Sequence, residues 1–171
     1  MFADDTNLFF KHDNFETLCD IVNQELAHVS RWFKLNKLSL NIKKTNYIIF
    51  KSKNKKINTD DIIITIDNSP IDRVESTKFL GVIINSSLTW NDHISTVCSK
   101  VSKSIGILLK LRNNVESDIL KMLYNTLILP YFSYCNIVWG SQTTVYLGKL
   151  YLKQKKAVRI INKSKWNANT E

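Results

Sequence analysis

The hydrophobic pattern changes its period near Trp90, and this change limits the folds open to the chain. Before Trp90, short segments rich in β-branched and apolar residues accompany one long helical segment. After it, apolar residues recur at intervals of three and four. The pattern predicts an α+β fold in residues 1–90 and an all-α region in residues 91–171, with a subdomain boundary near Trp90.

The first part contains one amphipathic helix and several short strands. Asn14 is the expected N-cap of a helix that runs to about Lys34. One face of that helix is apolar and is expected to point to a core: Phe15, Leu18, Val22, Leu26, Val29 and Phe33. Strands are expected at 7–11, 38–41, 46–51, 62–67 and 78–85, with a turn at 68–70. The strand at 7–11 would be the second strand of a tight hairpin.

The second part predicts three helices. The first starts at Asn91, and its expected core face is Ile94, Val97, Cys98, Val101, Ile105, Leu108 and Leu109, with Lys100, Lys103 and Lys110 off it. The second starts near Ser117 or Asp118 and is apolar on all sides until Pro130, which predicts a buried helix. The third spans about 145–163. Its expected apolar arc is Leu147, Leu150, Tyr151, Ala157, Val158 and Ile161, with Leu152 and Ile160 falling among the cations.

The net charge of +9 is concentrated near the C-terminal end. No Asp or Glu occurs from 119 to 170, and that stretch holds eight cations: Lys121, Lys149, Lys153, Lys155, Lys156, Arg159, Lys163 and Lys165. A field of one sign attracts polyanions, of which nucleic acid and an anionic membrane surface are the main candidates.

The cysteines and the apolar segments indicate the cellular compartment in which the protein is expected. Cys19, Cys98 and Cys135 are widely spaced and form no Cys-x-x-Cys pair, which favours reduced thiols over a disulfide frame or a zinc site. No signal-peptide pattern opens the chain, and the apolar segment 119–139 is interrupted by Lys121 and Pro130. We therefore expect an intracellular protein, nuclear or cytoplasmic, with no membrane partner and no transmembrane helix.

Adjacent carboxylates at Asp4 and Asp5 provide the hard oxygen ligands that Mg²⁺ prefers, although Asp pairs are also common in solvated turns. The segment Phe2-Ala3-Asp4-Asp5-Thr6 resembles the aromatic-x-Asp-Asp signature of reverse transcriptases. Further segments follow in the order and rough spacing of non-LTR (LINE-like, jockey-type) retrotransposon polymerases: Leu38-Ser39-Leu40-Asn41, Lys44-Thr45, Phe50, Lys78-Phe79-Leu80-Gly81-Val82 and Leu88-Thr89-Trp90-Asn91-Asp92-His93-Ile94.

The resemblance implies an RNA-directed DNA polymerase, with RNA template, DNA primer and deoxynucleoside triphosphate as partners. It implies that residues 1–90 are the C-terminal part of the palm and residues 91–171 a helical thumb. Asp4 and Asp5 would help bind two Mg²⁺ ions. Lys44 would give a proton or a positive charge to the leaving pyrophosphate, and the adjacent Lys43 is the alternative for this role. Phe79, Leu80 and Gly81 would form the primer-grip hairpin. Nucleic acid would contact the cations of the third helix: Lys149, Lys153, Lys156, Arg159 and Lys163.

Each of these assignments has a plainer alternative. Lys44 also fits a solvent-facing loop cation, Phe79 and Leu80 fit ordinary core residues, and Gly81 fits a β-bulge. The cationic helix face also fits a solvated surface, although a merely solvated face usually mixes charge signs. His12, His28 and His93 have no metal-ligand spacing and are interpreted as structural residues.

Polymerases of this family need another aspartate on an earlier strand, and fingers residues that bind the nucleotide. We therefore expect a palm-and-thumb fragment that is inactive alone. The alternative is a non-enzymatic, basic nucleic-acid-binding module. With six to eight phosphate contacts, its affinity for duplex DNA would fall with salt at a log–log slope of about −5 to −7. A membrane-surface protein with a basic amphipathic helix is a third, weaker interpretation.

Overall fold

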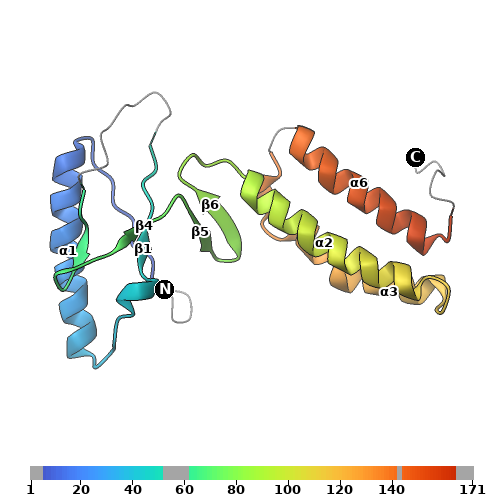
Figure 1. The fold of residues 1–171 in the computed structure, drawn as a ribbon, viewed down its shortest axis with the longest axis horizontal. Coiled ribbons are helices and arrows are strands. Elements are labelled where there is room, and N and C mark those ends of the chain that lie inside the picture. Colours follow the sequence, from blue (N-terminus) through green and yellow to red (C-terminus); the bar gives the residue numbers. More distant parts are fainter. Residues whose placement is uncertain (1–5, 52–61, 142–143, 165–171) are drawn as a thin grey trace. The chain divides into compact units, whose positions relative to one another are not determined.

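The computed structural model describes residues 6–51, 62–141 and 144–164. Its helices and short strands fall into two compact units (Figure 1). The first unit contains the residues up to Leu80 together with Asn85–Leu88, and the second contains Gly81–Ile84 together with the residues from Thr89 onward. Each unit has a hydrophobic core of its own.

The first unit is built on helix α1 (Phe15–Leu35), which confirms the helix predicted from the sequence. The side chain of Asn14 caps it by accepting a hydrogen bond from the backbone N–H of Thr17 at 2.9 Å. Such a cap satisfies one of the N–H groups that a helix leaves unpaired at its start. Leu26 is buried and forms a small core with Ile64, Ile66 and Ile71, while the other residues of the predicted face are only partly buried.

Two pairs of two-residue strands complete the first unit. Strand β1 (Asn46–Tyr47) pairs parallel with β4 (Asp72–Arg73), and β2 (Thr65–Ile66) pairs antiparallel with β3 (Ser69–Pro70). The predicted strands at 46–51 and 62–67 are therefore shorter than expected. The turn lies at Asp67 and Asn68, not at 68–70. Both residues have positive φ, 51° and 60°, a conformation that Asp and Asn tolerate and Pro70 cannot adopt.

Two predicted strands are absent. Residues 7–11 and 38–41 have no strand structure. A strand requires a neighbour for its backbone hydrogen bonds, and in the described residues neither segment has one. Asn41 instead caps the short 3-10 helix η1 (Ile42–Lys44), because its side chain accepts a hydrogen bond from the N–H of Lys44.

The predicted single strand at 78–85 is also wrong, because the chain reverses within it. Strand β5 (Ser76–Phe79) pairs with β6 (Val82–Asn85) across a two-residue turn. Leu80 and Gly81 both have positive φ, 46° and 85°, as in the turns that match the natural twist of a hairpin. An uninterrupted apolar segment concealed this turn.

The second unit is a group of helices around α2 (Asn91–Leu111). Helix α2 packs against α3 (Ser117–Leu127) and α6 (Thr144–Ile161), and α3 and α6 also touch (Figure 1). The predicted core face of α2 is confirmed except for Leu109, which is 44% exposed. The core brings together residues from several helices: Ile94, Val101, Leu108, Leu120, Ile128, Trp139, Leu150, Ala157 and Ile160.

The segment after α2 differs from the prediction in two respects. Helix α3 ends at Leu127, and Pro130 lies in the first turn of α4 (Leu129–Ser133), where its missing N–H is not needed. Of α3, Leu120 alone is fully buried, while Met122 is 58% exposed, so the predicted all-round burial is wrong. The helices of this unit cover one side of α3 only. A short helix, α5 (Asn136–Trp139), follows.

Among the described residues, no helix has the length and hydropathy needed to cross a membrane. The apolar segment 119–139 is divided among α3, α4 and α5. Cys135, at the start of α5, has a left-handed backbone with φ 51°. The thiol of Cys98 is buried, and those of Cys19 and Cys135 are partly buried; all three are free.

Candidate nucleic-acid interface

The predicted metal ligands Asp4 and Asp5 lie outside the described residues. Within residues 6–51, 62–141 and 144–164, no group of three His, Cys, Asp or Glu side chains is placed to hold a metal ion. The described residues therefore do not by themselves fit a metal centre, and the candidate site in this part of the chain is a surface for nucleic acid.

Lys44 ends the η1 turn. Its backbone N–H donates to the carbonyl of Asn41 at 3.0 Å, and the hydroxyl of Thr45 donates to the same carbonyl at 3.0 Å. These hydrogen bonds close a local turn over residues 41–45, and the turn fixes the backbone that carries the Lys44 side chain. Lys43 and Lys44 are both exposed, so the structure leaves both as candidates for the role of the palm lysine.

The β5–β6 hairpin places the predicted primer-grip residues in different environments. Leu80 lies at the turn and is 44% exposed. Phe79 is half-buried, and its ring packs edge-on against Phe9 with centroids 6.0 Å apart. Phe79 therefore has a packing role in the first unit, whereas Leu80 is exposed at the hairpin tip.

Two features of the structure at Gly81 disfavour any residue with a side chain. Its φ of 85° is strained for other residues, and a Cβ built on it would lie 3.3 Å from Cε1 of Tyr134. Val82, the next residue, is buried at 5% exposure. The start of β6 is therefore held closely on the helical unit, and the close approach of its backbone to an aromatic ring explains the glycine better than a bulge does.

Helix α6 carries the predicted nucleic-acid contacts, and the structure divides them into two groups. The ammonium of Lys153 donates to the hydroxyl of Ser102 at 2.6 Å, and that of Lys163 donates to the carbonyl of Val115 at 3.0 Å. Both ammonium groups therefore donate hydrogen bonds to other parts of the protein. Lys149 and Lys156 are exposed, and Arg159 is half-buried.

The buried face of α6 is rotated from the predicted arc. Ile160, which falls among the cations on the helical wheel, is buried at 3% exposure, while Tyr151 is 55% exposed. The core of α2 and α3 therefore contacts the side that contains Leu150, Ala157 and Ile160. Tyr151 points outward, and the ammonium of Lys155 lies 4.7 Å from its ring centroid. An aromatic ring thus joins the cations of the outer face.

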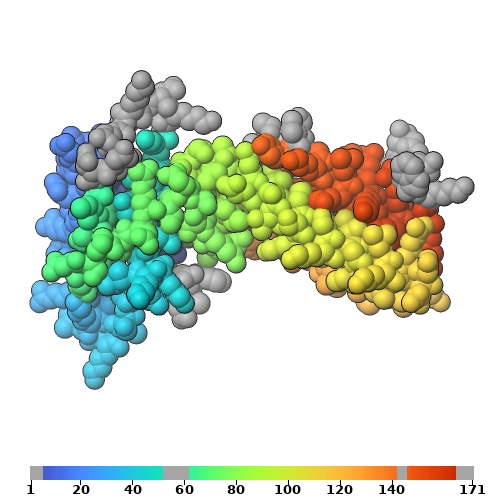
Figure 2. Space-filling model, in the orientation of Figure 1, coloured from blue at the N-terminus to red at the C-terminus, as the bar shows by residue number. Residues whose placement is uncertain are grey.

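The outer side of α2 adds further positive charge to the helical unit. Lys100, Lys103 and Lys110 are exposed, as predicted, and the ammonium of Lys100 lies 5.5 Å from the ring centroid of Tyr131. On the face of this unit drawn in Figure 2, α2 and α6 lie next to each other. Because no Asp or Glu occurs from 119 to 170, the charge of α6 is not balanced within that stretch.

Two curated proteins match the chain along nearly all of its length. The "RNA-directed DNA polymerase from mobile element jockey" of Drosophila funebris is 25% identical over 173 residues and covers 99% of the chain. The "Probable RNA-directed DNA polymerase from transposon X-element" of Drosophila melanogaster is 20% identical over 168 residues and covers 96%. The chain is a distant relative of mobile-element RNA-directed DNA polymerases.

The chain spans 18% of the length of each of these two polymerases. No family model matches the chain. No solved structure matches it. The relationship to the polymerases therefore rests on low sequence identity that is spread over almost the whole chain, in agreement with the resemblance that the motifs indicate.

Two buried polar residues of α2 form hydrogen bonds that their positions in the sequence did not predict. The ring of His93 is 5% exposed, and Nδ1 accepts a hydrogen bond from the N–H of Ile83 at 3.3 Å. The hydroxyl of Ser104 donates to the carbonyl of Leu127 at 3.0 Å, which joins α2 to the end of α3. The sequence did contain a signal for these hydrogen bonds, because both residues fall on the apolar face of α2, where a buried polar side chain needs a hydrogen-bond partner.

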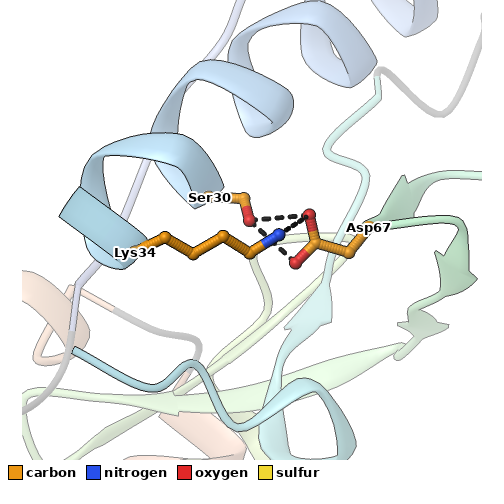
Figure 3. Close-up of polar contacts among 3 residues, drawn as sticks. All are labelled: Ser30, Lys34 and Asp67. Carbon is orange, nitrogen blue, oxygen red and sulfur yellow. Dashed lines mark hydrogen bonds and ion pairs between the residues drawn. The ribbon is translucent and has the colours of Figure 1, made fainter. Parts of the chain in front are cut away.

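A third buried polar residue, Ser30, ties α1 to the β2–β3 turn (Figure 3). Its hydroxyl donates to both carboxylate oxygens of Asp67, at 2.8 and 2.9 Å, and the ammonium of Lys34 lies 2.8 Å from Oδ1. The hydrogen bonds from Lys34 and Ser30 hold the pKa of Asp67 below its ordinary value. The cluster fixes a turn in which Asp67 has a left-handed backbone with φ 51°, and it has a structural role.

Proposed function

We propose that the chain forms part of an RNA-directed DNA polymerase, in which residues 1–90 belong to the palm and residues 91–171 to the thumb. The observation that carries this proposal is the match along 96% and 99% of the chain to two RNA-directed DNA polymerases. The series of motifs from Phe2 to Ile94 supports it, because the motifs occur in the family's order.

The helical unit would hold the duplex of template and primer. Phosphate backbones are recognised by clustered Lys and Arg side chains, and each neutralised phosphate releases counterions. The outward cations Lys149 and Lys156, with Lys155 stacked on exposed Tyr151, provide such a surface on α6. The internal hydrogen bonds of Lys153 and Lys163 make these two residues supports of the surface rather than contacts.

The hairpin tip would approach the primer strand. Leu80 is exposed there, and Gly81 gives the backbone a conformation that a side chain would strain. We assign Phe79 to positioning of the tip, since its ring packs against Phe9. Lys44 remains our candidate for the lysine that serves the leaving group, with Lys43 as its rival.

The candidate metal ligands lie outside the described residues. When bound, two Mg²⁺ ions would stabilise charge on the attacking and leaving oxygens of nucleotidyl transfer. Asp4 and Asp5 are the chain's candidate ligands. One adjacent pair of carboxylates provides few of the oxygen ligands that two such ions require. We therefore propose that the isolated chain binds nucleic acid and does not extend a primer.

The experiment is a binding titration of the whole chain with an RNA–DNA hybrid that has a recessed primer 3′ end. With about six phosphate contacts from the cations between 119 and 170, the log–log salt slope should be about −5. Primer extension with Mg²⁺ and all four nucleotides is measured in parallel. A flat salt dependence contradicts the binding role, and processive synthesis contradicts the proposed inactivity.

A further inference from the structure

His93 is a buried titratable residue that the proposed polymerase function does not use. It lies in the first turn of α2 with its ring 5% exposed and 5.5 Å from the ring of Trp139, centroid to centroid. Its Nδ1 accepts the hydrogen bond from the N–H of Ile83, so Nε2 carries the proton of a neutral ring. A protonated imidazole has N–H groups at both nitrogens and cannot accept this bond.

The hydrogen bond joins β6 to the helix that follows it. Three neighbouring contacts hold the segment Gly81–Ile84 on the helical unit. Gly81 lies against the ring of Tyr134, Val82 is buried, and the N–H of Ile83 donates to His93. The first two contacts are apolar or steric and do not depend on pH. Only the contact to His93 has a partner that titrates near neutral pH.

The surroundings of His93 favour the neutral ring. Burial lowers the pKa of His93, and the charge of Lys100 lowers it further. Neither β6 (Val82–Asn85) nor α5 (Asn136–Trp139), the elements against the ring, contains a charged residue. Asp92 beside it is exposed, Lys100 lies by Tyr131 of α4, and Lys149 and Lys153 of α6 act on Cys98 further along α2. The positive end of the α2 dipole also opposes protonation.

We propose that His93 is a positioning residue whose neutral ring fixes β6, together with Gly81 at its start, within the helical unit, and that protonation releases this strand. The inference rests on the proposed function only in the claim that the turn contacts a primer. The attachment itself is a property of the folded chain.

The attachment is tested by amide hydrogen exchange of Ile83 in the whole chain, expressed as a protection factor so that the intrinsic pH dependence is removed. Because the folded pKa of His93 is lowered, the stabilisation is complete above about pH 6.5 and is lost as pH falls through the folded pKa. We expect protection of Ile83 to fall about fivefold in acid, as for the loss of one hydrogen bond. The amide of Leu108, in the core of α2, serves as the internal control.

Two variants separate the hydrogen bond from packing. His93→Phe keeps a ring beside Trp139 but has no acceptor, so Ile83 should show the low protection of acid wild type at every pH value. His93→Asn places Oδ1 near the position of Nδ1 and does not titrate, so protection should be retained and become independent of pH. Ile83 protection in wild type that stays at its pH 7.5 value down to the pH at which the chain unfolds, or pH dependence that persists in His93→Asn, would overturn the proposal even if His93→Phe does not fold.

The link to the primer has a separate readout. Cross-linking of a primer 3′ end to the turn at Leu80 should weaken in His93→Phe and recover in His93→Asn. If Ile83 exchange responds as expected while cross-linking to the turn is unchanged, the positioning role is overturned. If the chain fails to bind primer–template at all, the proposed function fails, and the exchange measurement still decides whether His93 holds β6.

Discussion

Removal of two outward cations from α6 gives a quantitative prediction for nucleic-acid binding. Lys149 and Lys156 are both exposed and seven residues apart, so they lie on one side of the helix. Each phosphate contact contributes about −0.9 to the log–log salt slope, so the double variant Lys149→Gln/Lys156→Gln should reduce the slope by about 1.8. At 0.15 M salt, loss of two such contacts weakens binding by about thirtyfold.

The assay is fluorescence anisotropy with a labelled RNA–DNA hybrid over a range of salt concentrations. The matched control, Lys11→Gln/Lys37→Gln, removes the same charge from exposed positions of the first unit. A general effect of net charge would weaken both variants equally, whereas direct contact weakens the α6 variant alone. Equal slopes in the two variants, or a wild-type slope in the α6 variant, would refute the assignment of α6 to phosphate contact.

Three further predictions concern stability. Leu108→Ala, at a fully buried position, should lower the free energy of unfolding by about 2–5 kcal/mol in chemical denaturation. Gly81→Ala adds a methyl group 3.3 Å from the ring of Tyr134 at a φ of 85°, and thermal unfolding should show a loss of about 1 kcal/mol or more, whereas the same change at the open position Gly106 should show none. Because the folded pKa of Asp67 is lowered, its contribution is present above the ordinary carboxyl pKa and disappears as pH falls through the folded value. Asp67→Asn should remove that part of the acid dependence of the melting temperature, and an unchanged acid profile would show that the contacts in Figure 3 add no stability.

Local signals predicted the long helices well. Asn14 has a side chain suited to a helix N-cap, and α1 starts at the next residue. The core face of α2 followed from spacing alone, because a 21-residue helix repeats its apolar face several times. In both helices the information lies within a few residues along the chain, where the sequence can be interpreted without knowledge of tertiary contacts.

Contacts between distant segments explain the errors. The strand pattern did not predict the reversal at Leu80 and Gly81, which only the resemblance to a primer-grip hairpin implied, because leucine is an unusual residue at positive φ and residues 79–84 are all apolar or glycine. The orientation of α6 was wrong at Tyr151 and Ile160, since the cores of α2 and α3 decide which side is buried. The strand at 38–41 failed because no partner strand pairs with it in the described residues.

The candidate site was only partly accessible to sequence reasoning. The cations of α6 were found from their one-sign distribution, but the internal bonds of Lys153 and Lys163 depend on Ser102 and Val115, which are far away in the sequence. His93 has no metal-ligand spacing, and its bond to Ile83 depends on how β6 packs on α2. Such pairings are set by the fold and are not visible in the residue pattern.

The proposed polymerase role predicts that primer–template binds in one orientation, and photocross-linking tests this directly. A primer with a photoreactive group on its 3′-terminal nucleotide is annealed to RNA, irradiated with the whole chain and mapped by mass spectrometry. The proposed function predicts cross-links from the 3′ terminus to Leu80 and Gly81, and their loss when the group is moved to the 5′ end. Cross-links that are independent of the position of the group would contradict it and favour a basic module that binds nucleic acid without regard to the primer end.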